Sequence, residues 1–149
     1  MRLNLRAARR RPRTEVSLML DRLLALIPAV DGQGRECTVV LLAGGERRVI
    51  RARLRAVLRR ICLDLGVSLD VARQNAAEFL GRTRDLPVVL PPGRALACLP
   101  VAEHSRYANG YVMADRVRSV LPLNGGPHRT LLVFDDGTEL ALKTDTRVV

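Results

Sequence analysis

The sequence has few aromatic side chains: they make up 3% of the chain, as two tyrosines and two phenylalanines. Proteins that hold single-stranded nucleic acid usually stack its bases on aromatic rings. Tyr107 and Tyr111 could serve in this way, whereas Phe79 and Phe134 are predicted to lie in the core. The composition therefore argues against an RNA-binding platform that works by base stacking.

Cysteine is also scarce. Cys37, Cys62 and Cys98 are widely spaced, and the sequence contains no CxxC pair and no Cys/His cluster. We therefore predict no metal site, and we interpret the cysteines as buried free thiols of a reducing compartment. The glycine pairs at 44–45 and 125–126 lack the flanking residues of a phosphate-binding loop, so no cofactor is predicted either.

Long apolar runs are missing as well. No stretch approaches the roughly 20 apolar residues that a transmembrane helix needs. The apolar run Leu18–Val30 contains Asp21 and Arg22 and has no clear small-residue cleavage site, which fits a signal peptide poorly. The sequence predicts a soluble cytoplasmic protein without a membrane partner.

No catalytic motif is recognisable. The histidines, His104 and His128, fall in predicted loops without a nucleophile motif nearby, and Asp135 and Asp136 occupy a hairpin tip, where carboxylates are common. We predict that the protein is not an enzyme. A hydrolase built on the two histidines is the alternative, and it requires their loops to converge on an acid or a nucleophile.

Positive charge, in contrast, is abundant. Lysine and arginine number 25 against 15 acids, giving a net charge of +10, and every cation except Lys143 is arginine. Arginine pairs bidentately with phosphate and guanine and enters narrow minor grooves. A GC-rich genome would explain arginine in place of lysine, but it would not explain the excess of cations over acids. The charge favours a polyanionic partner.

The first fourteen residues carry much of this charge without any apolar period, which predicts a mobile arm at 1–14. Two interpretations are open for it: an arm that contacts phosphates or a minor groove, or a solvated leader. The arm residues that we single out are Arg9, Arg10, Arg11 and Arg13.

The remaining residues, 15–149, are predicted to form one domain. Residues Glu15–Leu26 are ambiguous between helix and strand. After them, turn residues alternate with β-branched and apolar runs, as in two successive hairpins. The predicted strands are 37–42 and 47–50, and the predicted turns are 31–34 and 43–46.

A helical period follows. Leu54, Val57, Leu58, Ile61 and Leu65 form one apolar stripe, while Arg51, Arg55 and Arg59 lie four apart on another face. Like charges at this spacing repel by a few tenths of a kcal/mol per pair, which suits a surface that binds anions.

A second helix is predicted to start at Ser68, with Asp70 in its first turn, and to stop at Gly81. The pair partly matches a helix-turn-helix, but Val71 and Asn75 do not fit the packing positions of that motif.

The last third of the chain favours strands. The clearest hairpin has a DG turn, and the segments 111–113 and 117–123 are either extended or briefly helical. The predicted strands are 86–90, 95–99, 130–134 and 138–142. The fold class is therefore α+β: a mostly antiparallel sheet with one central helix pair and a mobile basic arm.

Several short motifs occur in a familiar order. They are Ala25–Pro28 with Val30 and Asp31, a gap-free run from Gly66 to Pro87, Leu99–Pro100, Tyr111–Val112, and a closing hairpin with Phe134, Asp136, Gly137 and Leu140. In these motifs the chain resembles the ComK family, the competence transcription factors of Gram-positive bacteria. The resemblance covers about residues 24–143.

This resemblance implies a DNA-binding activator of competence genes that acts as a homo-oligomer at AT-rich boxes, approaching the minor groove. The expected partners are double-stranded DNA and, for an activator, RNA polymerase. The predicted DNA contacts are Arg51, Arg55, Arg59 and Arg73, with Arg82 and Arg84 beside them and the arm as an auxiliary contact.

Other interpretations stay open. Arg51–Arg60 could be a solvated face, with Arg84 paired to Asp85. The protein could instead be an RNA- or ribosome-associated basic protein, or a helix-turn-helix regulator unrelated to competence.

Overall fold

The computed structural model describes residues 19–81, 86–90, 93–99, 109–124 and 130–142. The predicted arm, Arg82, Arg84, His104 and His128 lie outside these residues. Within them the chain has an α+β fold, with antiparallel sheets and one helix pair, as the sequence predicts.

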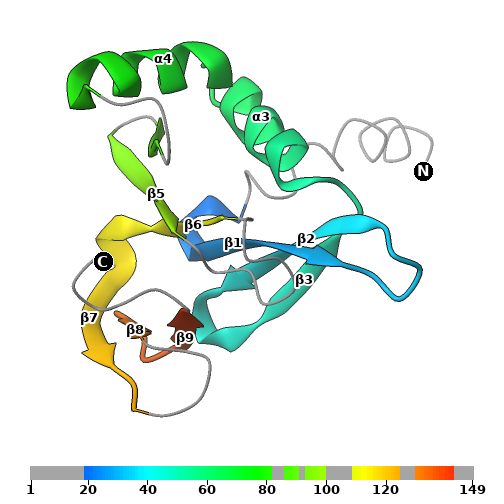
Figure 1. Ribbon diagram of the computed structural model, residues 1–149, viewed down its shortest axis with the longest axis vertical. Helices are drawn as coiled ribbons and strands as arrows, with labels where there is room; N and C mark the ends of the chain where they lie inside the picture. The colour runs from blue at the N-terminus through cyan, green and yellow to red at the C-terminus, as the bar shows by residue number, and fades with distance from the viewer. Residues whose placement is uncertain (1–18, 82–85, 91–92, 100–108, 125–129, 143–149) are drawn as a thin grey trace, which may run out of the picture.

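A six-stranded sheet forms the middle of the molecule (Figure 1). All of its strand pairs are antiparallel, in the order β3-β2-β1-β6-β5-β4. Its strands are β1 (Leu23–Val30), β2 (Glu36–Leu42), β3 (Arg47–Ile50), β4 (Val88–Leu90), β5 (Arg94–Leu99) and β6 (Gly110–Met113), and two 3-10 turns, η2 (Leu20–Arg22) and η3 (Ala43–Gly45), precede β1 and β3.

The ambiguous segment Glu15–Leu26 is described from residue 19 onward, where it forms η2 and the start of β1, a strand that is buried on both faces. A bulge between Leu23 and Ala25 adds one residue to β1, because Leu23 pairs with Leu42 while Ala25 pairs with Leu41. Leu23 packs in the cluster on the helix side, whereas Leu24 and Ala25 pack on the opposite face. Burial on both faces removes the alternation that marks a strand in the sequence.

A second, three-stranded sheet covers that opposite face, in the order β7-β8-β9 (Figure 1). Its strands are β7 (Val117–Pro122), β8 (Thr130–Phe134) and β9 (Glu139–Leu142), and a 3-10 turn, η4 (Ala114–Arg116), leads into β7. The segment around 117–123 is therefore extended. Phe134 and Leu132 of this sheet meet Leu24 and Val112 of the larger one in a continuous apolar cluster.

Helix α3 (Leu54–Asp64) lies on the other face of the six-stranded sheet. Its predicted apolar stripe is confirmed, since Val57, Leu58 and Ile61 are buried in the same cluster as Leu26. Burying side chains of this size stabilises a fold by about 1.5–3 kcal/mol each. Gly66 ends the helix with φ of +78°, a conformation that glycine adopts without strain.

Helix α4 (Leu69–Leu80) begins and ends where the sequence predicts. The Ser68 hydroxyl accepts the Val71 backbone N–H, and Gly81 adopts the left-handed conformation. Of the α4 side chains that the structure describes, only Leu69 is buried. Val71 is 53% exposed and Asn75 is exposed, so neither packs between the helices as a helix-turn-helix would require.

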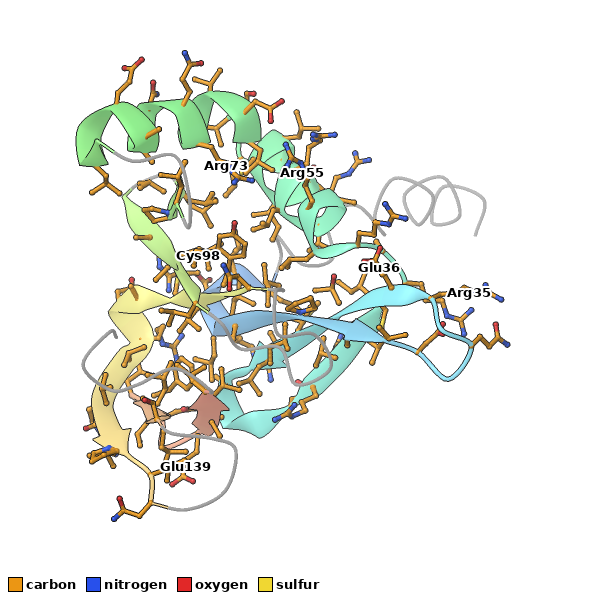
Figure 2. The ribbon with its side chains drawn as sticks, in the orientation of Figure 1. Arg35, Glu36, Arg55, Arg73, Cys98 and Glu139 are labelled. Carbon is orange, nitrogen blue, oxygen red and sulfur yellow. The ribbon has the colours of Figure 1, made fainter. Side chains whose placement is uncertain are left out.

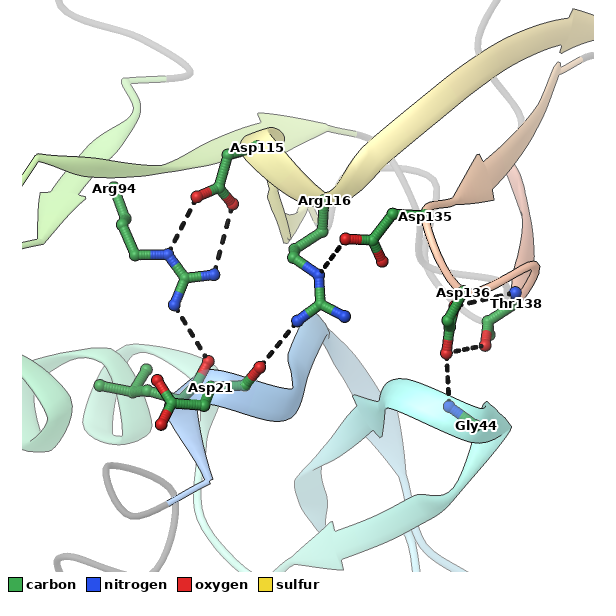
Figure 3. Close-up of polar contacts among 9 residues, drawn as sticks. Asp21, Gly44, Arg94, Asp115, Arg116, Asp135, Asp136 and Thr138 are labelled. Carbon is green, nitrogen blue, oxygen red and sulfur yellow. Dashed lines mark hydrogen bonds and ion pairs between the residues drawn. The ribbon is translucent and has the colours of Figure 1, made fainter.

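Polar contacts join the two sheets at the start of β1 (Figure 3). Arg116 donates to the Asp135 carboxylate and to the Asp21 backbone carbonyl, both at 2.7 Å. Arg94 donates to the Asp115 carboxylate at 3.0 Å. Because these arginines are themselves largely covered, the ion pairs have less exposure to water than the others in the molecule.

Asp136 makes a further contact between the sheets. It accepts the backbone N–H of Gly44 and both the N–H and the hydroxyl of Thr138 (Figure 3). These donors, the Gly44 N–H first, hold the pKa of the Asp136 carboxyl below its ordinary value of 3.8. Folding thus favours the charged Asp136 carboxylate, which contributes to stability at pH values above its ordinary pKa of 3.8.

We expect Asp136→Asn to lower the melting temperature at neutral pH, because the amide has only one oxygen to accept these bonds. The difference from the unmodified protein should shrink as the pH falls through the folded pKa of Asp136, where the carboxyl becomes protonated. Thermal unfolding over a series of acidic pH values measures this. Glu139→Gln, which removes the same charge from the exposed neighbouring strand, is the control. An equal and pH-independent loss in both variants would contradict the assignment.

Candidate nucleic-acid interface

Positive charge is concentrated on β3 and α3. Residues 47–64 contain seven arginines and one acid, Asp64. Helix α4 differs, because residues 69–80 contain one arginine, Arg73, and two acids, Asp70 and Glu78. An anion attracted by charge alone would therefore bind near α3 and the edge strand β3. The seven arginines are Arg47, Arg48, Arg51, Arg53, Arg55, Arg59 and Arg60.

Three of these arginines have acidic partners. Arg53 pairs with Glu36 at 2.7 Å and Arg48 with Glu46 at 3.1 Å. Arg22 also bonds Glu46, and together with Arg48 it lowers the pKa of this carboxyl. Exposed pairs of this kind contribute at most about 1 kcal/mol and exchange readily for another anion.

Arg55 is the third, with its guanidinium 3.4 Å from the Asp70 carboxylate. Both side chains are more than half exposed, so Asp70 holds Arg55 weakly.

The other four arginines have no ion pair or hydrogen bond among the described residues: Arg47, Arg51, Arg59 and Arg60. Arg51, Arg55 and Arg59 follow one another at four-residue spacing and are all exposed, and we call them the basic strip. Arg55 and Arg59 are one helical turn, about 5.4 Å, apart on α3, whereas Arg51 lies in the bend that precedes the helix. The predicted helical stripe therefore includes Arg55 and Arg59 but not Arg51, because α3 begins only at Leu54.

Arg73 does not join the basic strip. It falls four residues after the buried Leu69, on the side of α4 that faces the sheet, and it is only partly exposed. Figure 2 shows Arg73 and Arg55 near the junction of the two helices, with Cys98 of β5 beneath them. The predicted DNA contact Arg73 therefore lies on another helix and is less exposed than Arg51 and Arg59.

Tyr111 lies under the helix pair. It pairs with Cys98 across β5 and β6, its side chain is 6% exposed, and its hydroxyl is hydrogen-bonded to the Cys98 thiol. Burial, more than the neighbouring thiol, raises the pKa of Tyr111 to about 12, and the nearby charges of Arg73 and Arg55 act in the opposite direction. Sequence reasoning considered this tyrosine only for base stacking, and its burial excludes that role.

A groove of about 680 Å³ lies between α4 and β4. Its described lining is apolar apart from Ser68 and Asn75, with Val71, Leu80 and Val89 among the exposed apolar residues. No charged side chain belongs to that lining, so the groove does not suit a phosphate group. Sequence reasoning did not identify it, because it depends on how α4 packs against β4, and no local pattern encodes that packing.

The sequence predicted neither a metal site nor a transmembrane helix. No group of histidine, cysteine and acidic side chains in the described part of the chain could hold a metal ion. No helix there is long and apolar enough to cross a membrane. None of the three cysteines forms a disulfide among the described residues; Cys37 and Cys62 are buried as predicted, whereas Cys98 is only partly buried.

Comparison with known proteins finds no family model, no curated protein and no solved structure that matches this chain.

Proposed function

We propose that this protein binds double-stranded DNA through the basic strip and regulates transcription. The observation that carries the proposal is the group of three exposed arginines on α3 and just before it, two of which have no acidic partner among the described residues. Helix α3, anchored by Val57, Leu58 and Ile61, holds Arg55 and Arg59 one turn apart. Because the backbone that carries these arginines is already ordered, binding releases counterions from nucleic acid with little further loss of conformational entropy.

Burial of the aromatic residues favours a duplex over a single strand. The rings of Tyr111 and Phe134 are buried, so neither offers a face on which an unpaired base could stack. Contacts from the basic strip would then go mainly to backbone phosphates, which position a protein on the duplex. Sequence preference would come from the shape of the groove, because arginine prefers the narrow minor groove of A-tracts.

The resemblance to the ComK family supports double-stranded DNA as the partner. It leads to the more specific proposal that the protein acts in the cytoplasm as a homo-oligomer on AT-rich boxes and activates competence genes in contact with RNA polymerase. The exposed strip is compatible with oligomers on DNA, because it leaves the opposite face of the molecule, covered by β7–β9, away from the duplex.

We expect the full chain to bind an AT-rich duplex more tightly than a GC-rich duplex of equal length. Its affinity should fall with salt with a logarithmic slope of about −2.7 or steeper, because three phosphate contacts contribute about −0.9 each. Fluorescence anisotropy titrations at several salt concentrations measure both quantities.

Structured RNA of the same length is the matched competitor. Preference for the RNA would favour the RNA- or ribosome-associated class instead. A flat salt dependence would contradict binding by the basic strip, and equal affinity for the two duplexes would remove the preference for AT-rich DNA.

A further inference from the structure

The groove between α4 and β4 has the size of a small-molecule site. Its volume of about 680 Å³ falls within the range of about 300–1,000 Å³ that such sites occupy. β4 is the last strand of the six-stranded sheet at the edge opposite to the basic strand β3, and none of the basic-strip residues lines the groove. The groove is therefore separate from the candidate nucleic-acid interface.

Small side chains on α4 create the hollow. Ser68, Ala72, Ala76 and Leu80 all line the groove and follow one another at four-residue spacing, so they lie along one ridge of the helix. This ridge is about 18 Å long, because each helical residue advances about 1.5 Å. Alanine at its two central positions leaves space that a larger side chain would fill. The groove therefore suits an elongated occupant.

The walls of the groove are apolar and exposed. Seven large apolar side chains are exposed among the described residues, and three of them line this groove: Val71 at 53%, Leu80 at 43% and Val89 at 50%. Contiguous exposed apolar side chains mark binding sites more often than scattered ones do. An apolar occupant would remove all three from water, which favours binding by about 25 cal/mol for each Å² covered.

The polar groups of the lining determine which head group fits. The Ser68 hydroxyl already accepts the Val71 backbone N–H at 3.5 Å. The Asn75 side chain has no hydrogen bond among the described residues, and its amide can both donate and accept. No charged side chain belongs to the described lining, so an ionised ligand would lose water there without gaining a partner. The lining therefore favours an uncharged ligand with a hydrogen-bonding head.

A protein partner fits this groove less well than a small molecule. Ten described residues line the groove, whereas a stable protein interface uses about 20–30 residues on each side. Addition of a strand to β4 is also unfavourable, because β4 has three residues and follows Pro87, which has no N–H to donate.

We propose that the groove between α4 and β4 binds an uncharged aliphatic molecule with one hydrogen-bonding head group, such as an amide. The aliphatic chain lies along Ala72 and Ala76, and Asn75 bonds the head group. This proposal does not rest on the DNA-binding proposal, because its test contains no nucleic acid and the two can fail separately.

Octanamide, an uncharged molecule with an eight-carbon chain and an amide head, tests the proposal. Amide proton–nitrogen spectra of the full nitrogen-labelled chain are recorded as octanamide is added. We expect the signals of α4 and β4 to shift saturably, while those of β7–β9 stay in place. Octanoate, the matched ligand with a charged head, should bind the groove about 10-fold more weakly or worse. Octanoate can also meet the basic strip by charge, so only the α4 and β4 signals are compared.

Three variants locate the binding. Ala76→Leu places a larger side chain in the groove and should weaken octanamide binding about 10-fold or more. Gln74→Leu is the matched control, because it adds the same side chain at an exposed α4 position outside the lining and should change nothing. Asn75→Ala should weaken binding about 5-fold through loss of the head-group hydrogen bond, and it keeps the test decisive if Ala76→Leu fails to fold.

Several outcomes would overturn the proposal. They are the absence of saturable shifts on α4 and β4, equal binding of octanamide and octanoate there, and equal weakening by Ala76→Leu and Gln74→Leu. Shifts of the same signals with protein concentration, in the absence of ligand, would place a second copy of the chain in the groove and would also overturn it.

Discussion

Replacing Arg51 and Arg59 together with glutamine is expected to weaken duplex DNA binding about 30-fold near physiological salt. Each phosphate contact releases about 0.9 counterions, which corresponds to a roughly five-fold change in affinity between 1 M and 0.15 M salt. The logarithmic salt slope should become less steep by about 1.8. Both arginines are exposed and make no contact among the described residues, so folding should survive the change. Anisotropy titrations over a salt series measure the affinity and the slope together.

The matched control is the double variant Arg35→Gln/Arg118→Gln. Arg35 lies at the tip of the β1–β2 hairpin (Figure 2). Arg118 lies on β7, so this variant loses the same charge at exposed positions that are not part of the basic strip. We expect it to reduce affinity only slightly, through the smaller net charge. If both variants lost affinity equally, binding would depend on total charge and the basic strip would have no special role. Arg55 is left unchanged because, unlike Arg51 and Arg59, it pairs with an acid, Asp70.

Phe134→Ala is expected to lower the free energy of unfolding by about 3–5 kcal/mol. The Phe134 ring is fully buried in the cluster that joins the two sheets, together with Leu24 and Val112. Removing the ring loses the free energy of its transfer out of water and its packing contacts between the two sheets, and it leaves a cavity. Because domains of this size are stable by only about 5–15 kcal/mol, the loss is a large part of the total. Urea unfolding followed by circular dichroism measures it.

Leu121→Ala is the matched control for this effect. Leu121 lies in β7 and is 45% exposed, so its truncation should cost less than about 1 kcal/mol. A loss of less than about 1 kcal/mol for Phe134→Ala would mean that the contact between the sheets contributes little to stability. A changed slope of the urea transition, rather than a changed midpoint alone, would indicate that β7–β9 detaches before the rest unfolds.

The boundaries of the helix pair could be predicted because they depend on neighbouring residues. Ser68 caps α4 through a backbone N–H three residues away, and Gly81 ends it in a conformation that favours glycine. The β8–β9 hairpin follows equally from its Asp-Gly turn, where Gly137 has φ of +90°. Each of these signals acts within a few residues, so no distant contact is needed to interpret it.

The start of β1 could not be assigned in the same way. Leu23, Leu24 and Ala25 are all apolar because layers on both faces of the sheet cover them, and a bulge places two consecutive residues on one face. Neither the helical nor the alternating period survives such an arrangement. The second sheet that buries Leu24 comes from residues more than a hundred positions later.

The sequence by itself determined where the charge is, since the excess of arginine over acid in residues 47–64 is a property of composition. It also determined the apolar stripe that fixes α3, because helical periodicity is local. The direction of each arginine was decided only by the tertiary structure. Arg59 faces solvent, Arg55 meets an acid fifteen positions away, and Arg73 is only partly exposed. Those outcomes depend on how α4 lies on the sheet, and packing between distant elements sets that geometry.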